Sequence, residues 1–449
     1  MMVNSTVRLT VNGDRLNDSI ERLAKIGRQS NGDICRLAFT PEDLQARYRV
    51  QQWMTDAGMT VRIDAAGNLI GRYPGVDETA PVLATGSHID TVPSGGCYDG
   101  VLGVLAGIEI VRVLRENDVR LHHPIELIVF TDEESTMIGS RAIAGTVKST
   151  PESYKTSTGV SIQDALEAIG GNWDFLAQAR RSDLAAFVEL HVEQGAVLEK
   201  TGTQIGVVQG VVGMQRYQVS IAGQPNHAGT TPMTLRQDAL VAAAQLILAV
   251  QQIALAMPSQ PVGTVGYLTV APNAVNIVPG RVELSIDLRD LSCEVLDTML
   301  SQIQQQMQTI AATTNTTMEI QPILEVEPTP AAKHIQQTIA QICEETHLSY
   351  CHLPSRAGHD AMEMGRITEM GMIFVPSQAG ISHSGTEYTS PEQCVAGANV
   401  LLQTLLRLDA HYHQLKLKQA QPEQVAFDPN KPEKFPENLA LVTRNTISP

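Results

Sequence analysis

Three short, mainly apolar segments in the first half of the chain constrain its fold more than any other feature. Segments 81–86 (PVLATG), 125–130 (IELIVF) and 185–193 (AAFVELHVE) have the length and composition of buried strands. Between the first two lies 100–117, which is apolar almost throughout and long enough for a helix. Strands without polar alternation are typical of a parallel sheet covered by helices on both faces. These segments therefore predict an α/β fold with a mostly parallel sheet.

The middle of the chain has a different pattern. The chain has 449 residues, too many for one ordinary hydrophobic core, so we expect two domains. Within 214–327 the predicted elements follow the order β-α-β-β-α-β, which is the ferredoxin-like pattern. The predicted strands lie at 216–223, 262–270, 281–290 and 317–327, and the predicted helices at 235–257 and 293–314. We therefore predict a domain at 214–327, inserted into a discontinuous domain formed by 1–213 and 328–418.

The α/β pattern resumes after the inserted domain. Helices are predicted at 330–347 and 391–410, and a strand at 371–377. The tail 419–449 contains few apolar runs and several prolines, so we expect it to be a flexible extension.

Charge and cysteine content limit the partners and the compartment. The net charge is −16, from 32 basic and 48 acidic residues, which argues against a nucleic-acid partner and against attraction to anionic lipid. The N-terminal segment lacks a basic region followed by an apolar core, so we expect no secretory signal. No window approaches a run of about 18 uninterrupted apolar residues, so we expect no membrane span. The cysteines are scattered without a CxxC pair, which indicates reduced thiols in a cytoplasmic protein.

Histidine and acidic residues recur where the predicted strands of the α/β part end. In open α/β sheets, ligands bind beyond the carboxyl ends of the strands, so we expect these residues to converge on one crevice. They are His88, Asp90, Asp99, Glu133, Glu134, His191 and His383.

Each of these residues, taken singly, has a more common explanation. A lone histidine such as His191 is more often structural, and Asp90 and Asp99 would be turn or N-cap residues. The pair Glu133–Glu134 would be a solvated acidic pair at a helix start. Together, however, they form a mixed set of nitrogen and oxygen donors of the kind that zinc accepts. Of two consecutive glutamates, one could bind metal while the other accepts a proton from the attacking water.

Six segments resemble the motifs of the di-zinc aminoacylase/carboxypeptidase superfamily, in order and spacing. The resemblance covers about residues 15–410 and is greatest to the ureido-hydrolase branch, because His191 replaces the acidic residue usual in peptidase branches. That branch comprises N-carbamoyl-L-amino-acid hydrolases, bacterial-type β-ureidopropionases and allantoate amidohydrolases. The segments are SHIDTV…GCYDGVLGVLAGIE, FTDEES, ELHVEQG, NHAGTTPM, NIVPGRVELSIDLRD and SHSGTEYT.

The resemblance implies two divalent metal ions in the discontinuous catalytic domain, zinc first, with manganese or cobalt as alternatives. It implies that His88 and His191 bind one metal, that Glu134 and His383 bind the other, and that Asp99 bridges both. Asp90 would orient His88, and Glu133 would be the general base for a water held between the metals.

The resemblance also implies that the inserted domain is a lid that forms a homodimer. His227 would reach the active site of the partner subunit and stabilise the developing oxyanion. Gln194, Asn276 and Arg289 match substrate-binding positions, and Gly358 matches a main-chain contact to substrate. A planar guanidinium suits a carboxylate, although within DLRD an ordinary surface salt bridge is the alternative for Arg289.

One segment departs from the pattern of many relatives. EESTMIGSRA runs directly from Glu134 to Gly139, without an Arg-Phe-Gly element that relatives have there. We therefore expect a shorter loop near the second metal, with consequences for substrate size and for contacts with the lid.

The expected function is hydrolysis of the carbamoyl group of N-carbamoyl-L-amino acids to the amino acid, ammonia and carbon dioxide. Allantoate is the nearest alternative substrate, because it too is a carboxylate with ureido groups. A β-ureidopropionase, a dipeptidase or aminoacylase, and a non-catalytic binding protein are further alternatives.

Overall fold

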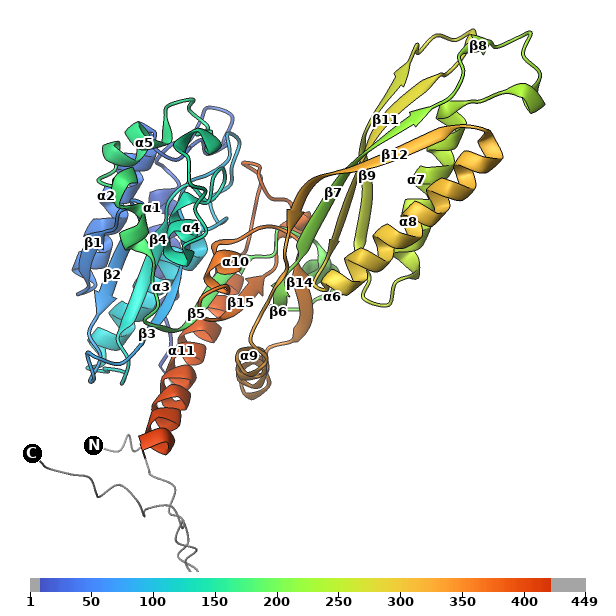
Figure 1. Ribbon diagram of the computed structural model, residues 1–449. Coiled ribbons are helices and arrows are strands. Elements are labelled where there is room, and N and C mark those ends of the chain that lie inside the picture. The colour runs from blue at the N-terminus through green and yellow to red at the C-terminus, as the bar shows by residue number, and fades with distance from the viewer. Residues whose placement is uncertain (1–8, 421–449) are drawn as a thin grey trace, which may run out of the picture.

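The computed structural model describes residues 9–420 (Figure 1). Most of the predicted tail 419–449 lies outside the described residues. Its first two residues belong to the last helix, α11 (Pro391–Ala420), which is longer than the predicted 391–410.

A nine-stranded sheet forms the base of the molecule, with the order β1-β2-β4-β3-β5-β15-β6-β13 and with β14 paired to β6. Its four central strands, β4, β3, β5 and β15, are mutually parallel, as the apolar segments predict, whereas strands toward the edges pair mainly antiparallel. The strands are β1 (Thr60–Ile63), β2 (Leu69–Tyr73), β3 (Val82–His88), β4 (Ile125–Phe130), β5 (Leu184–Val192), β6 (Ile205–Val211), β13 (Thr329–Pro330), β14 (Tyr350–Ser355) and β15 (Glu369–Val375).

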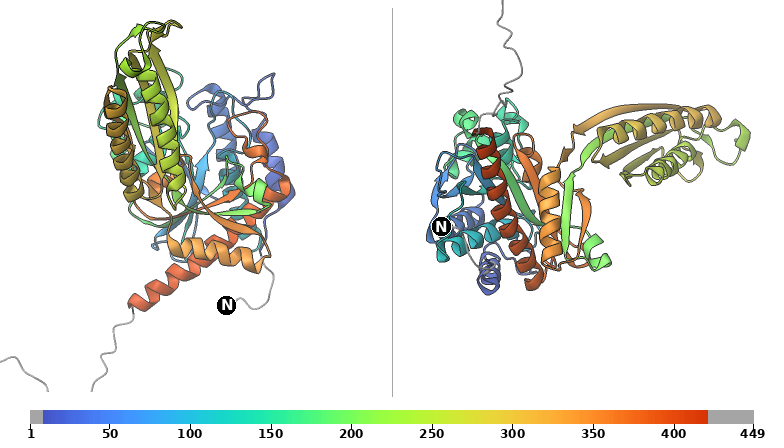
Figure 2. Two further views of the ribbon diagram at one scale, coloured as in Figure 1. Left: turned by 90° about the vertical axis from the view of Figure 1, so that its right-hand side faces the viewer. Right: turned by 90° about the horizontal axis from the view of Figure 1, so that it is seen from below.

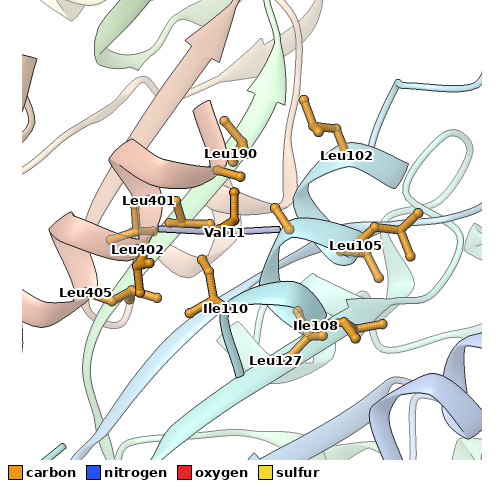
Figure 3. Packing of buried hydrophobic residues seen from close by; sticks show 14 of the residues in the cluster. Val11, Leu102, Leu105, Ile108, Ile110, Leu127, Leu190, Leu401, Leu402 and Leu405 are labelled. Carbon is orange, nitrogen blue, oxygen red and sulfur yellow. The ribbon is translucent and has the colours of Figure 1, made fainter. Parts of the chain in front are cut away.

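Helices cover this sheet on both faces. On one face α3 packs with α11 and α1, and Figure 3 shows side chains of α3, such as Leu105 and Ile110, near Leu127 of β4 and Leu402 of α11. Burial of these apolar side chains stabilises the sheet–helix layers by roughly 1.5–3 kcal/mol for each large side chain. The helices of this part are α1 (Gly13–Leu23), α2 (Pro41–Asp56), α3 (Val101–Glu116), α4 (Ile138–Ala144), α5 (Ile162–Ala168), α6 (Val197–Thr201), α9 (Lys333–Glu345), α10 (Asp360–Met364) and α11.

A second, antiparallel sheet with the order β12-β7-β11-β9 projects away from the first (Figures 1 and 2). Its strands and helices follow the predicted order β-α-β-β-α-β, and both helices cover the same face with a core of their own. A short pair, β8 and β10, lies near its far end (Figure 1). The elements are β7 (Gly213–Ala222), β8 (Asn226–His227), α7 (Ala239–Ala256), β9 (Val262–Ala271), β10 (Ile277–Val278), β11 (Arg281–Asp290), α8 (Cys293–Thr314) and β12 (Thr317–Val326).

Two predicted helices begin later than expected. The helix predicted at 235–257 begins at Ala239, because the Asp238 side chain accepts hydrogen bonds from the first free amides of α7. The helix predicted at 330–347 is α9, since residues 329–330 pair with β6 instead. By length and composition alone α7 could cross a membrane, but one of its faces is buried against the second sheet.

Candidate functional site

The four parallel strands bring the predicted metal ligands to one edge of the sheet. Because β4, β3, β5 and β15 are parallel neighbours, their carboxyl ends lie side by side. A cavity of about 230 Å³ opens at this edge. Among the residues that line it are His88, Asp99, Glu133, Glu134, His191, His383, Gln194 and Gly358.

The sequence predicted a strand that ends at residue 86, with His88 in the loop beyond it. In the structure His88 is the last residue of β3. The strand continues to this position because His88 pairs with Phe130 of β4. His191 lies within β5, whereas Glu133, Glu134 and His383 lie in loops that follow β4 and β15. The rigid sheet therefore fixes two of the histidines, and the loops supply the other groups.

Asp99 lies between two groups of possible ligands. Its Oδ1 is 3.1 Å from Nε2 of His191 and 3.5 Å from Nε2 of His88. Its Oδ2 is 3.5 Å from Nε2 of His383, and that nitrogen is also 3.5 Å from Oε2 of Glu134. The two oxygens of one carboxylate thus face two separate sets of nitrogen and oxygen donors, which suits a carboxylate that bridges two metal ions.

The loop that carries Asp99 is held by residues that the sequence analysis did not single out. Glu387 is buried, and its Oε1 accepts hydrogen bonds from the amides of Tyr98 at 2.9 Å and Asp99 at 3.1 Å. The Ser382 hydroxyl donates to Asp99 Oδ2 at 2.9 Å. Glu387 belongs to the SHSGTEYT segment, so the only signal for it in the sequence was its place in that motif.

Gly100 allows the loop to turn directly beside a ligand. Its φ is +67°, and a Cβ at this position would lie 2.5 Å from Nε2 of His88. Only glycine satisfies both the left-handed backbone and this close approach. The glycine-rich sequence before α3 therefore serves to place Asp99 next to His88.

Main-chain hydrogen bonds set the tautomers of the two buried histidines. Nδ1 of His88 donates to the carbonyl of Asp90 at 3.0 Å, and Nδ1 of His191 donates to the carbonyl of Val192 at 2.8 Å. In the neutral form with the proton on Nδ1, Nε2 of each ring carries the lone pair. Nε2 of His191 accepts a hydrogen bond from the Gly100 amide at 3.0 Å, and Nε2 of both rings lies near Oδ1 of Asp99. This tautomer is the form in which an imidazole binds a metal ion.

Asp90 is placed differently from its predicted role. Its carboxylate Oδ1 is 3.7 Å from Nδ1 of His88, so the hydrogen bond that orients the ring comes from the Asp90 carbonyl instead. The other oxygen, Oδ2, accepts a hydrogen bond from the amide of Glu134 at 3.2 Å. Through these two hydrogen bonds, Asp90 connects the end of β3, where His88 lies, to the turn that carries Glu133 and Glu134.

The adjacent glutamates face different histidines. Oε2 of Glu133 is 3.6 Å from Nε2 of His88, and Oε2 of Glu134 is 3.5 Å from Nε2 of His383. Burial raises the pKa of Glu133 well above its usual value, against the opposing attraction of His88. Burial likewise raises the pKa of Glu134 to about 8.

The charges of the site favour a bound cation. Burial would lower the pKa of His88, but the carboxylates of Glu133, Asp99 and Asp90 outweigh it and raise that pKa well above its usual value. When no metal is bound, a proton on the His88 imidazole thus supplies positive charge that offsets the negative charge of the neighbouring carboxylates. Two donor clusters satisfy ligand spacing around Asp99, His88–Asp99–His191 and Asp99–Glu134–His383. Their mixed nitrogen and oxygen donors fit zinc, manganese or cobalt.

The predicted substrate-binding residues fall into two groups. Gln194 and Gly358 line the cavity, and the Gln194 amide donates to Asp99 Oδ2 at 2.8 Å. Arg289 lies outside it on β11, where it pairs with Asp287 at 2.8 Å. Its Nη1 also donates to the carbonyl of Arg356 at 2.9 Å, so Arg289 contacts the loop that carries Gly358.

His227 and Asn276 are not brought to the cavity in this chain. They belong to the β8–β10 region at the far end of the second sheet (Figure 1). Nδ1 of His227 accepts hydrogen bonds from the amides of Gly229 at 3.0 Å and Thr230 at 3.2 Å. Because Nδ1 accepts, a neutral ring carries its proton on Nε2, and the exposed His227 can donate a hydrogen bond outward.

Comparison with known proteins shows the family to which this chain belongs. Residues 84–407 match the model of the peptidase family M20/M25/M40. The chain belongs to this family. The resemblance inferred from the six motifs is thereby confirmed, and so is the α/β fold with a mostly parallel central sheet.

Similar proteins include an N-carbamoyl-L-amino acid amidohydrolase and an allantoate amidohydrolase. The chain is 42% identical over 405 residues to an N-carbamoyl-L-amino acid amidohydrolase of Geobacillus stearothermophilus, covering 89% of this chain and 99% of that protein. It is 35% identical over 399 residues to an allantoate amidohydrolase of Bacillus subtilis, covering 88% and 97%. The crystal structure of a hydantoinase/carbamoylase family amidase from Burkholderia multivorans has a TM-score of 0.84 and 35% identity, covering 89% and 98%.

Proposed function

We propose that this protein is a metal-dependent amidohydrolase that removes the carbamoyl group from N-carbamoyl-L-amino acids, giving the amino acid, ammonia and carbon dioxide. The observation that carries the proposal is Asp99 between two donor sets, with Glu133 beside them in one small cavity. The names of the similar amidohydrolases support the same substrate class. Allantoate remains the alternative substrate.

Each residue of the site has a defined task in this proposal. His88, His191, Glu134 and His383 would hold two divalent ions around Asp99, and such ions supply Lewis acidity to the attacking water and the scissile carbonyl. Glu133 accepts the proton of that water and returns it to the leaving nitrogen. Its burial and raised pKa suit it to carry the proton between the two steps.

The substrate would be held by the second sheet as well as by the cavity. Arg289 would bind the substrate carboxylate with its planar guanidinium, with Asn276, Gln194 and Gly358 as further contacts. Nε2–H of His227, supplied by a partner subunit, would donate to the developing oxyanion. The position of His227 far from the cavity of its own chain favours this contribution from a partner.

The domain at 214–327 would accordingly be a lid that also forms a homodimer. Its outer strand β9 is an edge strand with the exposed side chains Tyr267 and Leu268. On α7, Leu248 and Leu255 are exposed on the face away from the sheet. Unpaired apolar edges are covered in stable proteins, and a second copy of the domain could cover this one. The cysteines of the described residues form no disulfide, and this agrees with a cytoplasmic enzyme.

A substrate panel tests the proposed function. The full chain, loaded with zinc or manganese, would be given N-carbamoyl-L-amino acids, N-carbamoyl-β-alanine and allantoate, and ammonia release would be measured. We expect N-carbamoyl-L-amino acids to give the highest kcat/KM.

Glu133→Gln should keep both metals and lose about 10²–10⁴-fold in kcat. Near-normal turnover by that variant would refute the role of Glu133, and failure to bind metal at all would support a binding protein.

A further inference from the structure

Arg141 lines the same cavity as the predicted metal ligands. The turn 135–137 connects Glu134 to α4, and it is closed by hydrogen bonds from the amides of Thr136 and Met137 to the carbonyl of Asp132, at 3.2 Å and 2.7 Å. Because this turn is so short, α4 starts directly beside the glutamate pair and carries Arg141 to the cavity wall. Among the described residues that line the cavity, Arg141 is the only arginine or lysine.

The counterion of Arg141 is weak and shared. Nε of Arg141 is 3.5 Å from Oε1 of Glu363, beyond normal hydrogen-bond length for a charged pair. Oε2 of Glu363 is engaged more closely by Arg366 at 3.2 Å, and it accepts a hydrogen bond from the Thr146 hydroxyl at 2.7 Å. One carboxylate therefore serves two guanidinium groups, and the positive charge of Arg141 is not fully neutralised.

The second arginine near the cavity already has a task. Arg289 contacts the loop of Gly358 from the lid side, and the proposed function assigns the substrate α-carboxylate to it. Arg141 is carried by α4, whereas Arg289 is carried by β11 of the second sheet. Arg141 in the cavity wall and Arg289 beside the loop of Gly358 are two separate guanidinium groups, which suits a ligand with two anionic groups.

We propose that Arg141 is a substrate-binding residue that pairs with a second carboxylate, and that the preferred substrates are ureido dicarboxylic acids, such as N-carbamoyl-L-glutamate. This inference rests on the proposed function and narrows its substrate class. A guanidinium that faces a small, partly buried cavity discriminates strongly against a neutral analogue, because the charge is then left without a partner.

The test compares N-carbamoyl-L-glutamate with its neutral isostere N-carbamoyl-L-glutamine on the metal-loaded enzyme. We expect the wild type to have a kcat/KM at least about 30-fold higher for the glutamate compound, mainly through KM. Arg141→Met should abolish this preference and leave kcat/KM for the glutamine compound within about threefold. Arg366→Met is the matched control, because it removes the other arginine of Glu363 from outside the cavity and should keep the preference.

The alternative outcomes are distinct. Equal loss of activity on both substrates in Arg141→Met, with metal content unchanged, would overturn the inference and assign Arg141 to the α-carboxylate or to loop support. Equal wild-type activity on both substrates would also overturn it. If the metal-loaded wild type hydrolyses no ureido compound, the proposed function fails by itself. Calorimetric binding of N-carbamoyl-L-glutamate then decides: affinity lost in Arg141→Met but not in Arg366→Met supports the dicarboxylate site, and any other result refutes it.

Discussion

Glu387 and Asp99 are 288 positions apart in the sequence, yet the Glu387 carboxylate accepts a hydrogen bond from the Asp99 amide at 3.1 Å. The same oxygen accepts from the Tyr98 amide at 2.9 Å, so one side chain from the C-terminal part of the chain secures the loop before α3. The position of the bridging carboxylate thus depends on the docking of the SHSGTEYT segment against the glycine-rich loop.

Replacing Glu387 should weaken metal binding through this loop. Glu387→Ala leaves the partly buried amide of Tyr98 and the buried amide of Asp99 without an acceptor, which costs about 1–3 kcal/mol of stability and about 10–100-fold in metal affinity. Glu387→Gln keeps a carbonyl acceptor and should lose clearly less of both. Thermal unfolding and metal titration check the pair of variants. Equal behaviour of alanine and glutamine would show that the hydrogen bonds do not position Asp99.

Gly100→Ala should remove the metal site without unfolding the protein. The added methyl group would lie 2.5 Å from Nε2 of His88, and the backbone φ of +67° adds strain of about 1–2 kcal/mol. Gly202→Ala is a matched control, because Gly202 has a φ of +64° and nothing within 4 Å of the added methyl. The Gly202→Ala control should show only the loss of stability caused by backbone strain. If elemental analysis finds as much metal in Gly100→Ala as in Gly202→Ala, the close approach of the methyl group to His88 does not affect metal binding.

Metal removal should destabilise the folded protein. Burial and neighbouring carboxylates raise the pKa of Glu133 and Glu134, so their charged forms are disfavoured when no cation is bound, and a metal at 1,000 times its Kd adds about 4 kcal/mol of stability. A chelator should therefore lower the melting temperature, and zinc or manganese should restore it. His383→Ala removes one exposed ligand of the second set, so we expect it to retain one metal per chain instead of two. An unchanged melting temperature after complete metal removal would contradict the ligand assignment.

Local patterns in the sequence were sufficient to predict the four central strands, but they did not reveal contacts between distant segments. Strand β14 was not predicted, because it is short and only partly buried and pairs with β6 far away in sequence. Arg36 could not be recognised as a fully buried residue, since its partners are main-chain carbonyls of Ile89 and Ile26 brought close only by folding. The hydrogen bond from His88 to the Asp90 carbonyl could not be predicted from the motif either, because a sequence motif gives side-chain identities and not main-chain contacts.

The proposed contribution of His227 in trans can be tested with mixed dimers. Chains carrying His227→Ala and chains carrying Glu133→Gln would be co-expressed with different tags, and dimers containing one of each would be purified. Each variant alone should be nearly inactive. In the mixed dimer, the chain with His227→Ala keeps its own Glu133 and receives an intact His227 from its partner, so one of the two sites should work. If His227 instead acted within its own chain, both sites of the mixed dimer would lack one group, and ammonia release would stay at the level of the single variants. Recovery of activity in the mixed dimer therefore requires both dimerisation and the exchange of His227, whereas a monomer in solution would exclude them together.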